Sequence, residues 1–173
     1  MAVMFTMGII LTSQTACRPS EVNAVFDNSV DVRLDGWAST DTLFYPFAVT
    51  DPATVTTPVL LHHPYRMKLN VRHSSDYPLL NVPFLLLLQQ TDTTGGYLHP
   101  IKNLLHLDLA PEVRDTTGMP QGTCWGSLYT TESTVPGHTF RFDSAGFYRF
   151  LVIPQIGSQQ KIPGIASIGI RLE

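Results

Sequence analysis

Charged side chains are scarce in this chain. Asp, Glu, Lys and Arg together make up 14% of its 173 residues, whereas soluble domains usually contain about 25%. Only 11 residues are Lys or Arg, and the net charge is −3, which argues against nucleic-acid binding because that needs a basic face. No apolar run approaches the ~20 residues of a membrane-spanning helix. The longest candidates are Val82–Leu88 and Met7–Leu11.

Cysteine is nearly absent, with only Cys17 and Cys124. A disulfide between the two is the simplest interpretation. The position of Cys17 favours another, because it closes an N-terminal segment with the features of a signal. Cys124 would then be unpaired, and a free cysteine is most often a small buried hydrophobe rather than a nucleophile.

The N-terminal segment Met1–Ala16 is uncharged and has an apolar centre, Met4–Leu11. These features are typical of a secretory signal peptide, and the Ala16-Cys17 junction resembles a bacterial lipobox, whose cysteine is acylated and becomes the mature N-terminus. We therefore expect residues 1–16 to be a lipoprotein signal peptide, Cys17 to be lipidated, and 17–21 to be a short tether to the membrane. The alternative is a plain buried N-terminal strand.

Sequence motifs for catalysis and nucleotide binding are absent. The chain has no GxSxG elbow, no GxxxxGK[ST] loop and no GxGxxG turn. Asp108, Glu112 and Asp115 are close in sequence, but two of them fall in an expected loop. Nothing therefore places them as the facing pair that glycoside cleavage requires. We expect no enzyme, no cofactor and no small-molecule substrate.

Histidine is the one potential metal ligand present in numbers, but its spacing does not favour a metal site. There is no HExxH motif, and adjacent His62 and His63 would point to opposite faces of a strand. We expect ordinary loop and strand-end histidines and no bound metal. The six are His62, His63, His73, His99, His106 and His138.

Proline and glycine are plentiful, at 13 and 12 residues, and favour many short elements joined by turns. Between the turns, apolar and polar residues alternate with a period of two, which indicates half-buried strands. We predict an all-β fold: a single antiparallel β-sandwich over residues 22–173, jelly-roll or immunoglobulin-like, with eight or nine strands. The expected strands are Val22–Asp27, Leu43–Val49, Tyr65–His73, Val82–Leu88, Leu104–Leu109, Thr123–Thr130, Thr139–Asp143, Phe147–Ile153 and the run from Ala166 to Leu172.

Three segments carry more specific expectations. Pro46 indicates an edge strand or a bulge. Val82–Leu88 is apolar on both parities, which is typical of a central strand covered on both faces. Ala110–Gly122 has no clear period and is expected to be a long loop, or a loop with one helical turn near Glu112.

The end of the chain, Thr139–Glu173, organises the rest in this interpretation. In its last strand we expect one parity to be buried and Ser167 and Arg171 to face outward. The residues expected to be buried are Ala166, Ile168, Ile170 and Leu172.

Aromatic residues in the irregular parts of the chain are candidates for surface recognition. Lectin-like sandwiches line carbohydrate or peptide grooves with such side chains. Trp37, Trp125 and Tyr129 are the best candidates, because they lie in the least regular parts of the chain. The alternative is that they pack in the core or along an edge.

Two segments are similar to a known family. One is Arg72–Val82, with Tyr77-Pro78 and Asn81; the other is the C-terminal part, ending in Pro163-Gly164-Ile165 and Arg171-Leu172-Glu173. Together they resemble the gliding-motility lipoprotein family GldH of the Bacteroidetes, which carries R-N-x-x-x-Y-P-x-x-N and ends near P-G-I-x-x-V-G-L-R-I-E. The resemblance implies an envelope lipoprotein linked to the type IX secretion machinery. It implies no catalytic residues.

Our leading hypothesis is therefore a lipid-anchored, non-enzymatic structural or assembly component of gliding motility or type IX secretion, placed at the outer membrane. Its expected partners are the membrane, through the lipid, and other envelope proteins. The alternative is a carbohydrate- or peptide-binding surface module. A flat apolar patch would favour the partner-protein role, and an exposed aromatic groove would favour the binding module.

Overall fold

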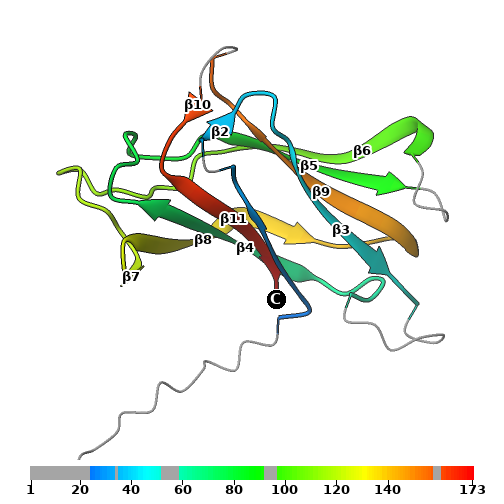
Figure 1. The fold of residues 1–173 in the computed structure, drawn as a ribbon. Helices are drawn as coiled ribbons and strands as arrows, with labels where there is room; N and C mark the ends of the chain where they lie inside the picture. Colours follow the sequence, from blue (N-terminus) through cyan, green and yellow to red (C-terminus); the bar gives the residue numbers. More distant parts are fainter. Residues whose placement is uncertain (1–23, 34, 52–58, 92–96, 158–160) are drawn as a thin grey trace, which may run out of the picture.

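In the computed structural model, which describes residues 24–33, 35–51, 59–91, 97–157 and 161–173, the chain folds into strands and loops, and the described part contains no helix (Figure 1). The side chains of residues 91–103 and 138 lie outside the description. Eleven strands are present: β1 Phe26–Asp31, β2 Trp37–Ala38, β3 Leu43–Val49, β4 Tyr65–Ser74, β5 Phe84–Thr91, β6 Tyr97–Leu109, β7 Thr123–Trp125, β8 Leu128–Phe140, β9 Gly146–Pro154, β10 Lys161–Ile162 and β11 Ile165–Leu172.

The strands form two main sheets whose neighbours are all antiparallel. The five-stranded sheet has the order β1-β11-β4-β8-β7 and the four-stranded sheet the order β3-β9-β5-β6. β2 and β10 make a separate two-stranded ribbon. The predicted all-β antiparallel sandwich is confirmed. The strand number exceeds eight or nine because β2 and β10 are too short to show a period.

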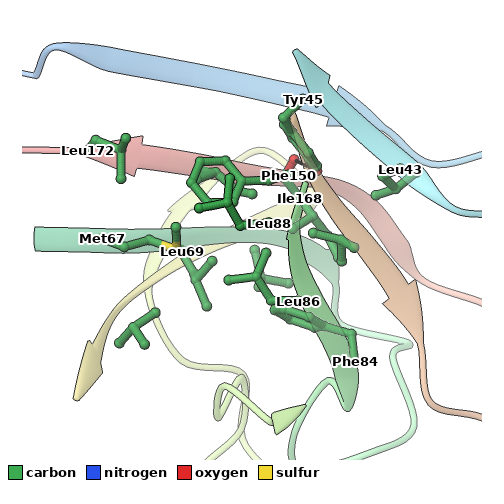
Figure 2. Packing of buried hydrophobic residues seen from close by; sticks show 14 of the residues in the cluster. Leu43, Tyr45, Met67, Leu69, Phe84, Leu86, Leu88, Phe150, Ile168 and Leu172 are labelled. Carbon is green, nitrogen blue, oxygen red and sulfur yellow. Dashed lines mark hydrogen bonds between the residues drawn. The ribbon is translucent and has the colours of Figure 1, made fainter. Parts of the chain in front are cut away.

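The core lies between the two main sheets (Figure 2). The inner faces of the two sheets meet there, and the ten labelled side chains of the cluster come from strands of one sheet or the other. Tyr45 of β3 also donates a hydrogen bond of 2.8 Å across the core to the carbonyl oxygen of Ile168 in β11. Burial raises the pKa of the Tyr45 hydroxyl, so the group stays a neutral donor. The labelled residues are Leu43, Tyr45, Met67, Leu69, Phe84, Leu86, Leu88, Phe150, Ile168 and Leu172.

The last strand, β11, lies inside the five-stranded sheet between β1 and β4. Ile168, Ile170 and Leu172 are fully buried, as predicted. Ser167 is the exception, because it is only 1% exposed. Its strand neighbours are Asp31 and Arg72, so a small hydroxyl in the middle of the sheet sits between longer side chains and is shielded by them. Alternation alone does not reveal this.

The segment before Ser167 is irregular. The pairing of β11 with β4 shifts between Ile165 and Ser167, and Ala166 is half-buried rather than buried. A β-bulge leaves one residue without a partner and breaks the alternation locally. The prediction that Ala166 is buried is therefore wrong for a local reason.

The predictions for β3 and β4 are confirmed closely. Leu43–Val49 is β3, an edge strand with Pro46 on the exposed side. The Tyr65–His73 run is β4, one residue longer, with alternate side chains buried.

Other boundaries differ from the expectation. The first strand is Phe26–Asp31 instead of Val22–Asp27. Thr139–Asp143 is not a separate strand, because its first two residues end one long strand, β8, whose bulge contains Gly137 at φ 70°. Glu112 lies in an isolated bridge with Asn81 rather than in a helical turn.

Candidate functional site

The outer face of the four-stranded sheet carries apolar side chains in rows across the strands. Residues paired in register point to the same face of a sheet. Leu151 of β9 pairs with Phe44 on one side and Leu87 on the other, so these three form the central row. The whole set, called here the apolar face, is Phe44, Pro46, Ala48, Leu85, Leu87, Phe147, Leu151 and Ile153.

The apolar face is partly open to solvent, although Leu151 in its central row is only 7% exposed. Phe44 is 47% exposed and Phe147 is 45% exposed. On β5, Leu85 and Leu87 are half-buried, whereas Phe84 and Leu86 on the inner face are fully buried. The expectation that this strand is covered on both faces is therefore wrong, since no described element lies over the outer one. The sequence did indicate two apolar faces for this strand, because apolar residues occupy both its even and its odd positions.

One polar pair lies within the apolar face. Arg149 donates two hydrogen bonds to Oε1 of Gln89, from Nε at 2.9 Å and from Nη2 at 2.6 Å. Its guanidinium carbon is 5.3 Å from the ring centroid of Phe44, within the range of a cation–π contact. These contacts hold the guanidinium of Arg149 against Gln89 and the Phe44 ring.

The opposite outer face of the sandwich, on the five-stranded sheet, is charged. Lys68 forms ion pairs with Glu132 at 3.0 Å and Glu173 at 3.1 Å. Arg171 pairs with Asp27 at 2.8 Å and with Glu132 at 3.4 Å. The hydrogen bond to Glu132 is the main reason why the pKa of Lys68 is raised. Charged side chains of this kind are well solvated and need no partner protein, whereas a contiguous apolar surface marks an interaction site.

The three aromatic residues expected to recognise a ligand do not converge. Trp37 is fully buried and donates a hydrogen bond of 2.8 Å from Nε1 to the carbonyl oxygen of Asp41. The prediction for Trp37 is therefore wrong, because the pairing of β2 with β10 folds this irregular segment over the core. Trp125 is 88% exposed in β7, next to the turn into β8. Tyr129 is half-buried, and its ring stacks on that of His73 with 5.7 Å between the ring centroids.

Strand geometry also separates Trp125 from Tyr129. Tyr129 pairs with Cys124, and successive residues of a strand point to opposite faces. Trp125 therefore projects from the other side of the hairpin. No shared aromatic groove results.

The cysteines and histidines give no metal site in the described part of the chain, where no group of three or more candidate ligands occurs. Cys124 is a free and exposed thiol, which corrects the expectation that it is buried. Cys17 lies outside the described residues. His62, His63 and His106 are exposed, and the side chains of His99 and His138 are not described.

His73 is the one described histidine that is buried. Its Nδ1 lies 3.1 Å from the carbonyl oxygen of Ser74, and its Nε2 lies 3.3 Å from Oγ1 of Thr131. Burial lowers the pKa of the imidazole. The ring is therefore a neutral, hydrogen-bonded part of the core.

The two segments that carry the family resemblance meet at the Ser74 end of β4. The amide of Ser74 donates a 2.7 Å hydrogen bond to the carbonyl oxygen of Gly164. The buried Tyr77 hydroxyl donates to the carbonyl oxygen of Asn81 at 2.7 Å, and Arg114 Nε donates to the carbonyl oxygen of Tyr77 at 2.7 Å. These contacts fix a turn, so the motif residues have a structural role here.

The described residues contain no helix long and apolar enough to cross a membrane. The fold and the surface together define a two-sheet β-sandwich with one charged and one apolar outer face. The chain belongs to the GldH lipoprotein family, whose model matches residues 24–172. Neither a curated protein nor a solved structure matched the chain. The family supports a membrane-anchored lipoprotein of the cell envelope in the context of gliding motility.

Proposed function

We propose that this protein is a non-enzymatic assembly component of the gliding and type IX secretion machinery, held at the outer membrane by acylated Cys17. We propose further that the apolar face binds another envelope protein. The observation that carries the proposal is the contrast between the two outer faces of one sandwich. One has a network of ion pairs around Lys68 and Arg171, while the other exposes Phe44 and Phe147.

The position of the N-terminus fits a domain held close to a membrane. The amide of Val25 donates a hydrogen bond to the carbonyl oxygen of Leu172, and Phe26 pairs with Leu172 in the sheet. The chain therefore enters the sandwich where β11 ends. The stretch from Cys17 to residue 24 spans at most roughly 25 Å when extended. A lipid at Cys17 would therefore keep this end of the domain near the bilayer and leave the apolar face presented sideways, toward neighbouring proteins.

Photo-crosslinking in cells tests the proposal directly. Phe44 and Phe147 would each be replaced by a photoreactive phenylalanine in the full-length chain, with Ser29 and Thr130, on the opposite sheet, as controls. We expect one and the same envelope protein to be captured from positions 44 and 147 and not from 29 and 130. Equal capture from all four positions, or none from the apolar face, would contradict the proposal.

A carbohydrate-binding role is the second candidate, and Trp125 is the observation that favours it. An indole that is 88% exposed can stack on a sugar ring. Trp125→Ala should abolish polysaccharide retention in this case and leave the crosslinks from Phe44 unchanged.

A further inference from the structure

The edge strands of the sandwich are not equally protected. Native proteins protect sheet edges with short strands, charges, proline or bulges. β7 has 3 residues, β1 has 6 and carries two aspartates, and β3 carries Pro46. β6 has 13 residues, and no described strand pairs with its outer edge. Its first half contains Pro100 and Lys102, whereas its second half, Leu104–Leu109, contains neither proline nor lysine and a single acidic residue, Asp108.

A bulge in β6 turns a leucine toward the space between the sheets. Leu88 pairs with Leu105 and Gln89 with Asn103, which leaves Leu104 without a partner. Leu104 is 49% exposed and borders a hollow of about 300 Å³. The other apolar walls of this hollow are Leu88, Leu105, Phe140, Phe142 and Tyr148. Bulges frequently redirect a side chain next to a binding site.

A second hollow, of about 290 Å³, lies at the other end of the same stretch. It is bordered by Leu109 of β6, Leu69 of β4 and Val135 in the bulge of β8. Between the two hollows, Leu105 and Leu107 are only half-buried, so the inner side of β6 is not fully covered. The two hollows and these leucines are called here the groove. Its lining is mixed, because Arg141 and Asp143 also border the first hollow and Asp108 borders the second.

We propose that the outer edge of β6 binds an extended segment of another polypeptide, which adds a strand to the four-stranded sheet. In an edge strand, alternate residues point their backbone N–H and C=O groups away from the sheet. The backbone of an added extended segment can form hydrogen bonds with all of these groups. The side chains of an added strand alternate between the faces. Every second one would therefore enter the groove.

The spacing of the groove defines the partner segment. Leu105 and Leu109 are four residues apart, or roughly 13 Å along a strand. The segment needs apolar side chains at positions i, i+2 and i+4, with the first and last filling the two hollows. A lipid chain would fill the hollows but leave the edge amides unpaired, which is why we assign the groove to a polypeptide. This site is separate from the apolar face and does not depend on it.

Selection from a displayed library of random heptapeptides against the purified full-length chain tests the assignment. We expect enriched peptides with apolar residues at alternate positions. Hydrogen exchange should show that the best peptide, made synthetically, slows the amides of 104–109. Methylating backbone nitrogens on one edge of that peptide should abolish binding, while the same change on the other edge should be neutral.

Variants of the chain complete the experiment. Leu104→Asp should weaken peptide binding by about tenfold or more, because it replaces an apolar wall of the first hollow by a charge. Met119→Asp is the matched control, since Met119 is 63% exposed and lies outside the groove. Three results would overturn the assignment. They are enriched peptides without alternating apolar residues, binding that tolerates methylation of either edge of the peptide, and equal effects of the two variants. Protection of 104–109 by self-association alone would also overturn it, in favour of a second copy.

Discussion

Gly164 lies directly against the backbone of Tyr77. A Cβ built at Gly164 would be 2.9 Å from the Tyr77 amide nitrogen and 2.9 Å from Oγ of Ser74. Gly164 also has φ +86°, a conformation that side chains disfavour. One glycine thus joins the two segments on which the family resemblance depends.

Gly164→Ala should be strongly destabilising. Both the positive φ and the close approach to backbone atoms penalise a methyl group. Gly118→Ala is the matched control, because Gly118 has φ +84° and nothing within 4 Å of its added Cβ. The control should show only the conformational cost, about 1–2 kcal/mol. Urea unfolding of both variants measures the difference, and equal losses would show that the contact with Tyr77 contributes nothing.

The final strand gives a second pair of variants. Ile168 is fully buried, so Ile168→Ala should cost about 2–5 kcal/mol. Ser167→Ala should be neutral or slightly stabilising, because Oγ of Ser167 is buried without a hydrogen-bond partner among the described residues. Chemical denaturation tests both. A substantial loss in Ser167→Ala would show that the hydroxyl makes a contact that matters.

His73 should make the stability depend on pH. Burial lowers its pKa in the folded state below the ordinary value of about 6.5, so below that value the unfolded chain binds more protons. The contribution is complete above about pH 6.5 and is lost as the pH falls toward the folded-state pKa. The nearby Arg114 acts in the same direction.

Melting temperatures at pH 7.5 and 5 for the parent, His73→Gln and His106→Gln measure this effect. His73→Gln should flatten the pH dependence, and the variant of the exposed His106 should keep it. An unchanged slope in His73→Gln would assign the pH dependence to other groups.

The fold was largely predictable from the sequence where alternation and burial coincide. Leu43–Val49 is recovered to the residue, because one face of this edge strand packs on the core and the other is exposed. Trp37 was assigned wrongly, because its segment has no period and is buried by a long-range pairing with β10. Ser167 was assigned to the correct parity, but its shielding depends on neighbours from two other strands.

The candidate site was predictable only in part. The apolar residues on both parities of Val82–Leu88 indicated a second apolar face, but they did not show that it is open. The row of Phe44, Leu151 and Leu87 combines three strands that are distant in sequence. Register between such strands is set by tertiary packing and turn geometry, which a single sequence does not specify.

The apolar face should tolerate polar substitution without loss of stability. Phe44→Ser with Phe147→Ser removes side chains that are already nearly half exposed, so we expect the melting temperature to change by a few degrees at most. Capture of the partner protein should fall sharply. Exchanging Ser29 and Thr130 for alanine is the control on the opposite sheet. A collapse in stability would mean that the two rings serve the fold, and unchanged capture would move the partner to another surface.

Cys17 decides whether the domain reaches its place in the envelope. If it is acylated, Cys17→Ser should move the protein from the membrane fraction to the soluble fraction, because the variant lacks the lipid proposed to anchor it. One acyl chain binds a bilayer only marginally, so stable anchoring requires two or more, and mass spectrometry of the mature N-terminus should find them on a chain lacking residues 1–16. Cys124 provides an internal control, because its exposed thiol should react with maleimide in both forms. An intact Met1 on envelope protein, or a Cys17–Cys124 disulfide in non-reducing peptide maps, would contradict the lipid anchor and the orientation of the domain that depends on it.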